Sequence, residues 1–180
     1  SSSPRVNPAR LNTVCATVSP HIATPCVQTT PRLTMTTFDD EGLSPQPTRL
    51  LHTMLRVADL ERSIEFYTNK LGMRLHRQER FPQGRFTLAF VGYGHESTDA
   101  SIELTYNWDQ SAYQRGTAYG HIALAVHSVA KSCASLQAAG VSVVREAGPM
   151  QSLSPDRTSA ENIAFIEDPD GYQIELIERR

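Results

Sequence analysis

Two stretches of the chain place a single carboxylate between two large aliphatic residues, Ile102–Glu103–Leu104 and Ile174–Glu175–Leu176. Alternate residues of a β-strand face opposite sides of the sheet, so each glutamate is expected to face away from its apolar neighbours. On its own, such a glutamate usually marks the solvent-facing side of a half-buried strand. A second pattern upstream makes these two glutamates more informative.

Each glutamate is preceded by the pattern His-x-x-Leu-x-Val, which begins at His52 and again at His121. Glu103 follows His52 by 51 residues, and Glu175 follows His121 by 54. The chain therefore contains one module twice, and internal repetition of this kind indicates architecture before any single motif does.

A helix is predicted after each histidine strand. Asp59 and Ser128 are suitable N-cap residues, because a short side-chain oxygen can accept a free backbone N–H. Glycine accepts the left-handed conformation that ends a helix, and Gly72 and Gly140 stand 20 and 19 residues after their histidines. Between cap and glycine, apolar residues recur three and four apart, as on one face of a helix: Leu60, Ile64, Tyr67 and Leu71, then Val129, Cys133 and Leu136.

Strands are predicted for the rest of each module. The expected strands are 50–57, 73–76, 86–91 and 100–106 in the first module, and 121–126, 141–146, 163–166 and 172–177 in the second, with a polar loop at 148–162 and a β-turn at Asp168–Gly171. The fold class is therefore α+β, with two tandem βαβββ modules at about 50–108 and 119–178 inside a domain of residues 50–180.

Related modules packed about a pseudo-two-fold axis bring equivalent residues together, here His52, Glu103, His121 and Glu175. Two imidazoles and two carboxylates without a thiolate suit Zn, Ni, Co, Mn or Fe(II). Such a metal can act as a Lewis acid on a carbonyl oxygen, and a carboxylate beside it can take a proton. His76, His95 and His127 have no repeat partner and are expected to be surface or turn residues.

Composition excludes some classes of function. The net charge of −2 over 180 residues gives no electrostatic case for nucleic-acid binding. No apolar run approaches the roughly 20 residues of a membrane-spanning helix. Cys15, Cys26 and Cys133 form neither a disulfide framework nor a metal motif, and Cys133 is most simply a small buried hydrophobe.

Residues 1–49 differ from the rest of the chain. Ser1 to Phe38 contain no Asp or Glu, three Arg, twelve Ser or Thr and five Pro. This composition resembles an organelle transit peptide, which would direct the protein to a plastid or mitochondrion. The alternative is a disordered tail without a targeting function, which would leave the protein in the cytoplasm.

Residues 50–178 resemble the vicinal-oxygen-chelate superfamily, and within it the glyoxalase I (lactoylglutathione lyase) family in its short bacterial-type form. The resemblance lies in seven motifs: Leu51–Val57, Ser63–Tyr67, Leu71–Met73, Phe90–Gly94, Ile102–Trp108, Gly116–Ile122 and Glu167–Glu175. It implies a cupped mixed sheet around a metal site, with the metal ligands at His52, Glu103, His121 and Glu175.

The resemblance also implies a reaction, the isomerisation of the glutathione–methylglyoxal hemithioacetal to S-lactoylglutathione through an enediolate. Glu175 is then the base that moves the proton, and Glu103 assists from the opposite face. Arg56 and Asn107 match positions that hold the γ-glutamyl end of glutathione. The alternatives are a surface ion pair for Arg56 and a turn residue for Asn107.

The chain departs from the family where the glycyl carboxylate of glutathione is bound. Thr117 stands where some members carry an arginine, and Arg157 is the only basic residue of the 150–162 loop. The short form implies nickel or cobalt more than zinc, and a homodimer whose sites are shared between two copies. The open alternatives are pairing of the modules within one chain and a thiol related to glutathione.

Two other classes of function are less consistent with the residues. An extradiol dioxygenase or an antibiotic-modifying thiol transferase on this fold uses three protein ligands, so Glu103 as a fourth argues against both. A metal-free binding module would not need two histidines and two glutamates in register.

Overall fold

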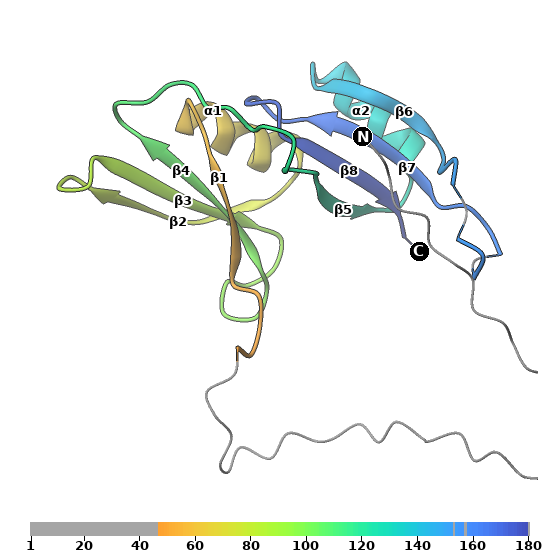
Figure 1. Ribbon diagram of the computed structural model, residues 1–180, viewed down its shortest axis with the longest axis horizontal. Helices are drawn as coiled ribbons and strands as arrows, with labels where there is room; N and C mark the ends of the chain where they lie inside the picture. The colour runs from red at the N-terminus through yellow and green to blue at the C-terminus, as the bar shows by residue number, and fades with distance from the viewer. Residues whose placement is uncertain (1–46, 153, 157, 180) are drawn as a thin grey trace, which may run out of the picture. The chain divides into compact units, whose positions relative to one another are not determined.

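The computed structural model describes residues 47–180 except 153, 157 and 180, and these form one compact unit. The chain runs through two modules of the same element order (Figure 1). The first contains β1 (His52–Arg56), α1 (Leu60–Glu65), the π-helical η1 (Phe66–Lys70), β2 (Arg74–Phe81), β3 (Phe86–Gly92) and β4 (Ser101–Asn107). The second contains β5 (Ile122–Val126), α2 (Val129–Ala138), β6 (Ser142–Pro149), β7 (Asn162–Glu167) and β8 (Gln173–Glu178).

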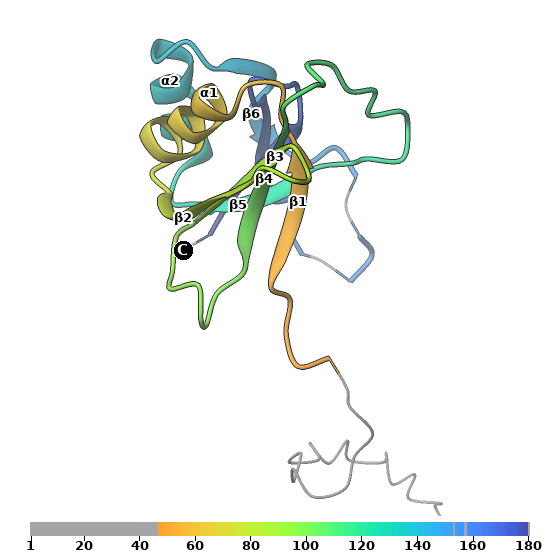
Figure 2. The same ribbon diagram turned by 90° about the vertical axis from the view of Figure 1, so that its left-hand side faces the viewer.

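Each module forms one four-stranded mixed sheet. The strand orders are β1-β4-β3-β2 and β5-β8-β7-β6, so the first strand of each module pairs with its last. These first–last pairs are parallel, whereas the other neighbours are antiparallel. Figures 1 and 2 show α1 with the first sheet and α2 with the second. The predicted α+β class with two βαβββ modules is confirmed.

The predicted helix caps are confirmed. Asp59 Oδ1 accepts the backbone N–H of Arg62 at 3.0 Å, and the Ser128 hydroxyl accepts that of Lys131 at 3.4 Å. Gly72 and Gly140 follow the two helices with φ of +72° and +82°, which glycine adopts without steric cost.

The sequence predicted one continuous α-helix before Gly72, but the first helix is α-helical only as far as Glu65. After Glu65 it continues as η1, in which the Leu71 N–H reaches the Phe66 carbonyl at 3.2 Å, five residues back. The Thr68 hydroxyl donates to the Ile64 carbonyl at 2.8 Å. A hydroxyl on that carbonyl competes with the regular helical bond and favours the wider turn.

Two strands extend three or more residues past their predicted ends. β2 extends through a polar run to Phe81, and β6 continues to Pro149, inside the expected loop. Both pair with a neighbouring strand along their length. This pairing stabilises strand structure in segments whose residues do not alternate between apolar and polar. β2 carries one register shift, between Leu75 and Arg77, and β6 carries two, one on each side of Arg145.

The apolar core lies on the helix-facing side of the sheets. Leu55, Leu104, Ile174 and Leu176 are buried there, on the faces opposite Glu103 and Glu175. No helix in the described part of the chain is long and apolar enough to cross a membrane.

The modules meet at the predicted β-turn between β7 and β8. The buried Tyr67 hydroxyl donates to Asp168 Oδ2 at 2.9 Å, while Oδ1 of the same carboxylate accepts the N–H groups of Asp170 and Tyr172. Burial raises the pKa of Asp168. Burial and the neighbouring Asp168 also raise the pKa of Tyr67, so the phenol remains a donor.

Candidate metal centre

The first half of the candidate site lies on the sheet face opposite the helices. β1 runs parallel to β4 in a register that pairs His52 with Ser101 and Met54 with Glu103. Side chains two residues apart on a strand share a face, so the imidazole and the carboxylate meet there. His52 Nε2 lies 3.0 Å from Glu103 Oε2.

The second half repeats this arrangement. β5 runs parallel to β8, with Ala123 paired to Glu175, and His121 directly precedes β5. His121 Nε2 lies 3.0 Å from Glu175 Oε2. The two histidine side chains are 39% and 41% exposed, and the two glutamates 14% and 12%. Each half therefore presents one accessible nitrogen donor beside one largely buried oxygen donor.

The four predicted ligands are brought together as two pairs. Among residues 47–180, as far as they are described, no group of three or more His, Cys, Asp or Glu side chains could hold a metal ion. One chain therefore presents two half-sites, one on each sheet. Each half-site has one histidine and one glutamate, which is half of the predicted ligand set.

A phenylalanine packs on each histidine. Phe90 of β3 pairs with Glu103 and meets the His52 ring edge-on at 5.6 Å, and Phe165 of β7 pairs with Glu175 and meets His121 at 5.3 Å. Sequence reasoning missed both residues. Phe90 precedes its glutamate by 13 residues and Phe165 by 10, because the connections to β4 and β8 differ in length.

An arginine faces each phenylalanine from the outer neighbouring strand. Arg77 of β2 pairs with Phe90, and Arg145 of β6 pairs with Phe165. The register shifts bring both arginines into these positions. The Arg77 guanidinium lies 3.6 Å from the Phe90 ring centroid, whereas Arg145 donates to the carbonyls of Ile163 and Pro149.

The two glutamates differ in one contact. Glu103 Oε1 accepts a hydrogen bond from the Thr105 hydroxyl at 2.9 Å. Ile177 occupies the equivalent position, two residues after Glu175. Within the described chain, His121 is the only polar partner of the Glu175 carboxylate.

The predicted glutathione-binding residues lie further along the first sheet. Arg56 is exposed on β1 and lines a cavity of about 320 Å³ that also includes Tyr113, Arg115 and Asp170. The Arg56 side chain forms no ion pair with another described residue. Asn107 ends β4, and its side-chain amide donates to the Tyr113 hydroxyl at 3.0 Å. Arg157 lies outside the described residues.

Of the three histidines expected at surface or turn positions, His95 and His127 are exposed outside the helices and strands, as predicted. His76 instead lies half-buried in β2, within the register shift. Its ring lies over Gly92, where an added Cβ would be 2.9 Å from Nε2.

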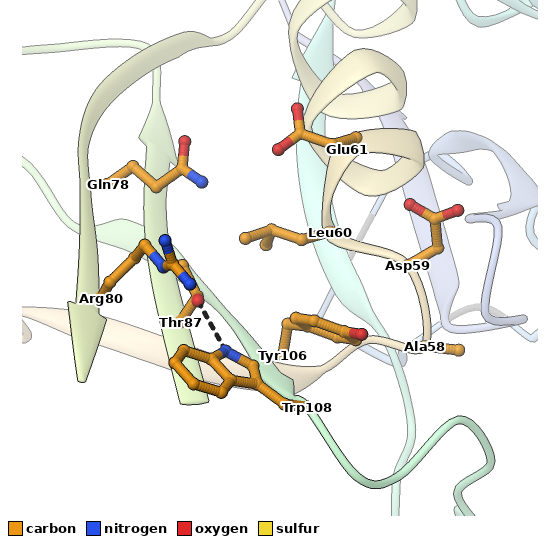
Figure 3. A pocket seen from close by; sticks show the side chains of 9 residues that line it. All are labelled: Ala58, Asp59, Leu60, Glu61, Gln78, Arg80, Thr87, Tyr106 and Trp108. Atoms are coloured by element: carbon orange, nitrogen blue, oxygen red, sulfur yellow. Dashed lines mark hydrogen bonds between the residues drawn. The ribbon is translucent and has the colours of Figure 1, made fainter. Parts of the chain in front are cut away.

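A cavity of about 610 Å³ opens on the other face of the first sheet, between the start of α1 and β2, β3 and β4 (Figure 3). Trp108 lies at its edge and donates to the Thr87 hydroxyl at 2.9 Å. Thr87 pairs with Tyr106, and alternation places both opposite the face that carries Glu103. This cavity includes none of the predicted site residues.

Comparison with known proteins identifies the relatives of this chain. A family model described as the Glyoxalase/Bleomycin resistance protein/Dioxygenase superfamily matches residues 49–176. The lactoylglutathione lyase of Escherichia coli O157:H7 is 55% identical over 132 residues, which cover 73% of this chain and 93% of that protein. The lactoylglutathione lyase of Neisseria meningitidis serogroup A is 53% identical, with 73% and 91% covered.

Solved structures of similar proteins agree. Glyoxalase I from Zea mays superposes with a TM-score of 0.66 and 41% identity over 73% of this chain, which spans only 44% of the maize chain. The trypanothione-dependent glyoxalase I of Leishmania major gives a TM-score of 0.62 and 41% identity, covering 73% of this chain and 87% of that one. The chain belongs to the Glyoxalase/Bleomycin resistance protein/Dioxygenase superfamily, and within it to the lactoylglutathione lyase (glyoxalase I) family.

Proposed function

We propose that the chain is a lactoylglutathione lyase, a carbon–sulfur lyase that isomerises the glutathione–methylglyoxal hemithioacetal to S-lactoylglutathione and so detoxifies methylglyoxal. The observation that carries the proposal is the same His–Glu pair at 3.0 Å in both modules. The 55% identity to a lactoylglutathione lyase supports the same reaction.

The paired residues fit a divalent metal ion. Two half-sites together supply two imidazole nitrogens and two carboxylates, a donor set for Ni, Co or Zn. We favour nickel or cobalt over zinc, with one ion per site. The bound ion supplies Lewis-acid stabilisation of the negative charge that develops on the substrate oxygens.

The chain's own residues then move one proton. Glu175 takes it from the carbon that bears sulfur and returns it to the neighbouring carbonyl carbon. The hydroxyl proton of the sulfur-bearing carbon passes to the former carbonyl oxygen, so the isomerisation balances without a further reactant. Glu103 assists from the opposite face. Arg56 and Asn107 hold the γ-glutamyl end, because a guanidinium pairs with a carboxylate in a bidentate manner, and Arg157 holds the glycyl carboxylate.

Activity measurements test these roles. The metal is removed with a chelator, and isomerase activity is measured after Ni²⁺, Co²⁺ or Zn²⁺ is added back separately. Restored activity that is lost in Glu175→Gln supports the proposal, whereas a protein that binds metal but is inactive with every ion contradicts it. Arg56→Ala and Arg157→Ala should each raise KM for the glutathione adduct, and an unchanged KM argues against the substituted residue.

We further propose a homodimer in which the first module of one copy completes the site of its partner's second module. Support comes from the half-sites, since neither holds more than two ligands. The test mixes inactive His52→Ala and His121→Ala proteins after unfolding and refolding them together. Random pairing across copies restores about a quarter of wild-type activity, because half the dimers carry one intact site of two. Sites built within one chain restore none.

The thiol is tested separately. The name of the Leishmania major relative describes a trypanothione-dependent enzyme. We propose glutathione for this chain, on the basis of the lactoylglutathione lyases at 53–56% identity. A kcat/KM that is higher for the trypanothione adduct than for the glutathione adduct would reverse this assignment.

The N-terminal residues 1–49 lie almost entirely outside the described residues, and we propose that they target the protein to a plastid or mitochondrion. A fluorescent protein fused after residue 49 should enter one of these organelles. Cytoplasmic fluorescence would favour a tail without a targeting function. We propose residues 50–180 as the catalytic domain, which should keep full activity when expressed alone.

A further inference from the structure

The two half-sites match in their His–Glu distance, in the phenylalanine that packs on the histidine and in glutamate exposure, but not in how the carboxylate is held. Both oxygens of Glu103 are engaged, Oε2 by His52 at 3.0 Å and Oε1 by the Thr105 hydroxyl at 2.9 Å. Glu175 has the His121 contact, and the described chain offers it no second polar partner.

The difference follows from one residue in each repeat. Thr105 stands two positions after Glu103 on β4, and Ile177 two positions after Glu175 on β8, so each shares the face of its glutamate. Thr105 is 9% exposed, and water therefore competes little for its hydroxyl. Glutamate exposure cannot explain the difference, because it is 14% for Glu103 and 12% for Glu175.

A hydrogen bond to an ionised carboxylate is stronger than a neutral one and also restricts rotation of the group. The contacts to His52 and His121 are equivalent in the two modules and would give way to the metal ion in a loaded site. The Thr105 hydrogen bond is therefore the restraint that distinguishes Glu103 from Glu175. A carboxylate that carries a proton between two carbons must move, whereas one that remains beside the metal should not.

We propose that Thr105 is a positioning residue that fixes Glu103, and that isoleucine at position 177 leaves Glu175 free to move the proton. This inference rests on the proposed function. It assigns the different behaviour of two equivalent glutamates to one hydroxyl that is present in the first half-site and absent from the second.

Threonine and valine have nearly the same shape, so the chain offers a matched experiment at both positions. Thr105→Val removes the hydroxyl, and Thr105→Ser keeps it. Ile177→Thr adds a hydroxyl beside Glu175, and Ile177→Val is its control without one. Ser101→Ala removes a second hydroxyl near Glu103, one that is buried without a hydrogen-bond partner among the described residues.

The first measurement is Ni²⁺ affinity, by competition with a chelator. We expect Thr105→Val to weaken Ni²⁺ binding about tenfold, the order expected for one hydrogen bond to a charged group, while Thr105→Ser and Ser101→Ala keep wild-type affinity. Ile177→Thr should bind Ni²⁺ more tightly than Ile177→Val. Equal affinities within both pairs would overturn the proposal, provided that thermal unfolding shows all variants folded.

The second measurement separates kcat from KM in the Ni²⁺-loaded protein. Ile177→Thr should have a kcat about tenfold below that of Ile177→Val at unchanged KM, because Glu175 is then tethered. An equal kcat in these two variants overturns the assignment. If the wild-type protein lacks isomerase activity, the proposed function fails, yet the Ni²⁺ affinities still test whether Thr105 positions Glu103.

Discussion

The first and second modules present the same His–Glu pair on the same kind of sheet, but they hold it differently. In the first module Thr105 binds the glutamate, and Arg77 lies over the phenylalanine that packs on the histidine. In the second, Ile177 replaces the threonine, and Arg145 binds backbone carbonyls instead. The repeated contacts form the proposed metal donor set, and the unrepeated ones are the basis for the proposal that the two glutamates behave differently.

The largest expected effect comes from removing the two carboxylates separately. Glu175→Gln should lower kcat about 10²–10⁴-fold, the usual contribution of a general base. The fold-loss in kcat for Glu103→Gln should be about ten times smaller than that for Glu175→Gln, because Glu103 acts as a fixed group. Bound metal is quantified in both variants, so that loss of the ion is separated from loss of the base. Equal losses at full metal occupancy would contradict the division between the two modules.

Removing one hydroxyl oxygen should weaken the junction between the modules. Tyr67→Phe removes the donor to Asp168 Oδ2 and leaves a buried carboxylate oxygen without that partner. We expect the free energy of unfolding to fall by about 1–3 kcal/mol. Urea unfolding measures the loss, and Tyr93→Phe is a suitable control because the Tyr93 hydroxyl bonds to the Leu71 carbonyl at an exposed position. A loss no larger than that of the control would show that the junction does not depend on this bond.

The two helix N-caps allow a comparison of the modules in which the expected stability effects are smaller. Asp59→Ala should cost about 1 kcal/mol of unfolding free energy. Ser128→Ala should cost less, because its hydrogen bond is 3.4 Å long where that of Asp59 is 3.0 Å. Chemical denaturation of the two variants ranks the caps, and the reverse order would show that bond length does not set their strength.

The smallest effect is a pH dependence at the junction. Burial raises the pKa of Asp168 above its ordinary 3.8, so the folded protein holds this proton more tightly than the unfolded chain does. The contribution of Asp168 to stability is therefore greatest at low pH and falls as pH rises through the raised pKa. Unfolding of the wild type and Asp168→Asn across this range should give a stability difference that declines with rising pH and then levels off. A difference that grows with pH would mean that the pKa is lowered.

Local patterns in the sequence predicted much of the fold. The strand alternation around Glu103 and Glu175, the caps at Asp59 and Ser128 and the glycines at 72 and 140 each depend on residues close together in the chain. The repeat also predicted that His52, Glu103, His121 and Glu175 come together in one place. Among the described residues they lie instead as two His–Glu pairs, one in each module.

Other features depend on contacts between distant segments, and only the tertiary structure decided them. The length of β2 follows from its pairing with β3. The positions of Phe90 and Phe165 depend on the lengths of the connections to β4 and β8, and the wide turn of η1 on a side-chain hydrogen bond. None of these has a fixed spacing in the sequence. The sequence determined one repeated fold and four candidate ligands at equivalent positions of the repeat. The tertiary structure decided that one chain holds those ligands as two separate pairs, and that Thr105 contacts only one of the two glutamates, because both depend on how sheets and side chains pack in space.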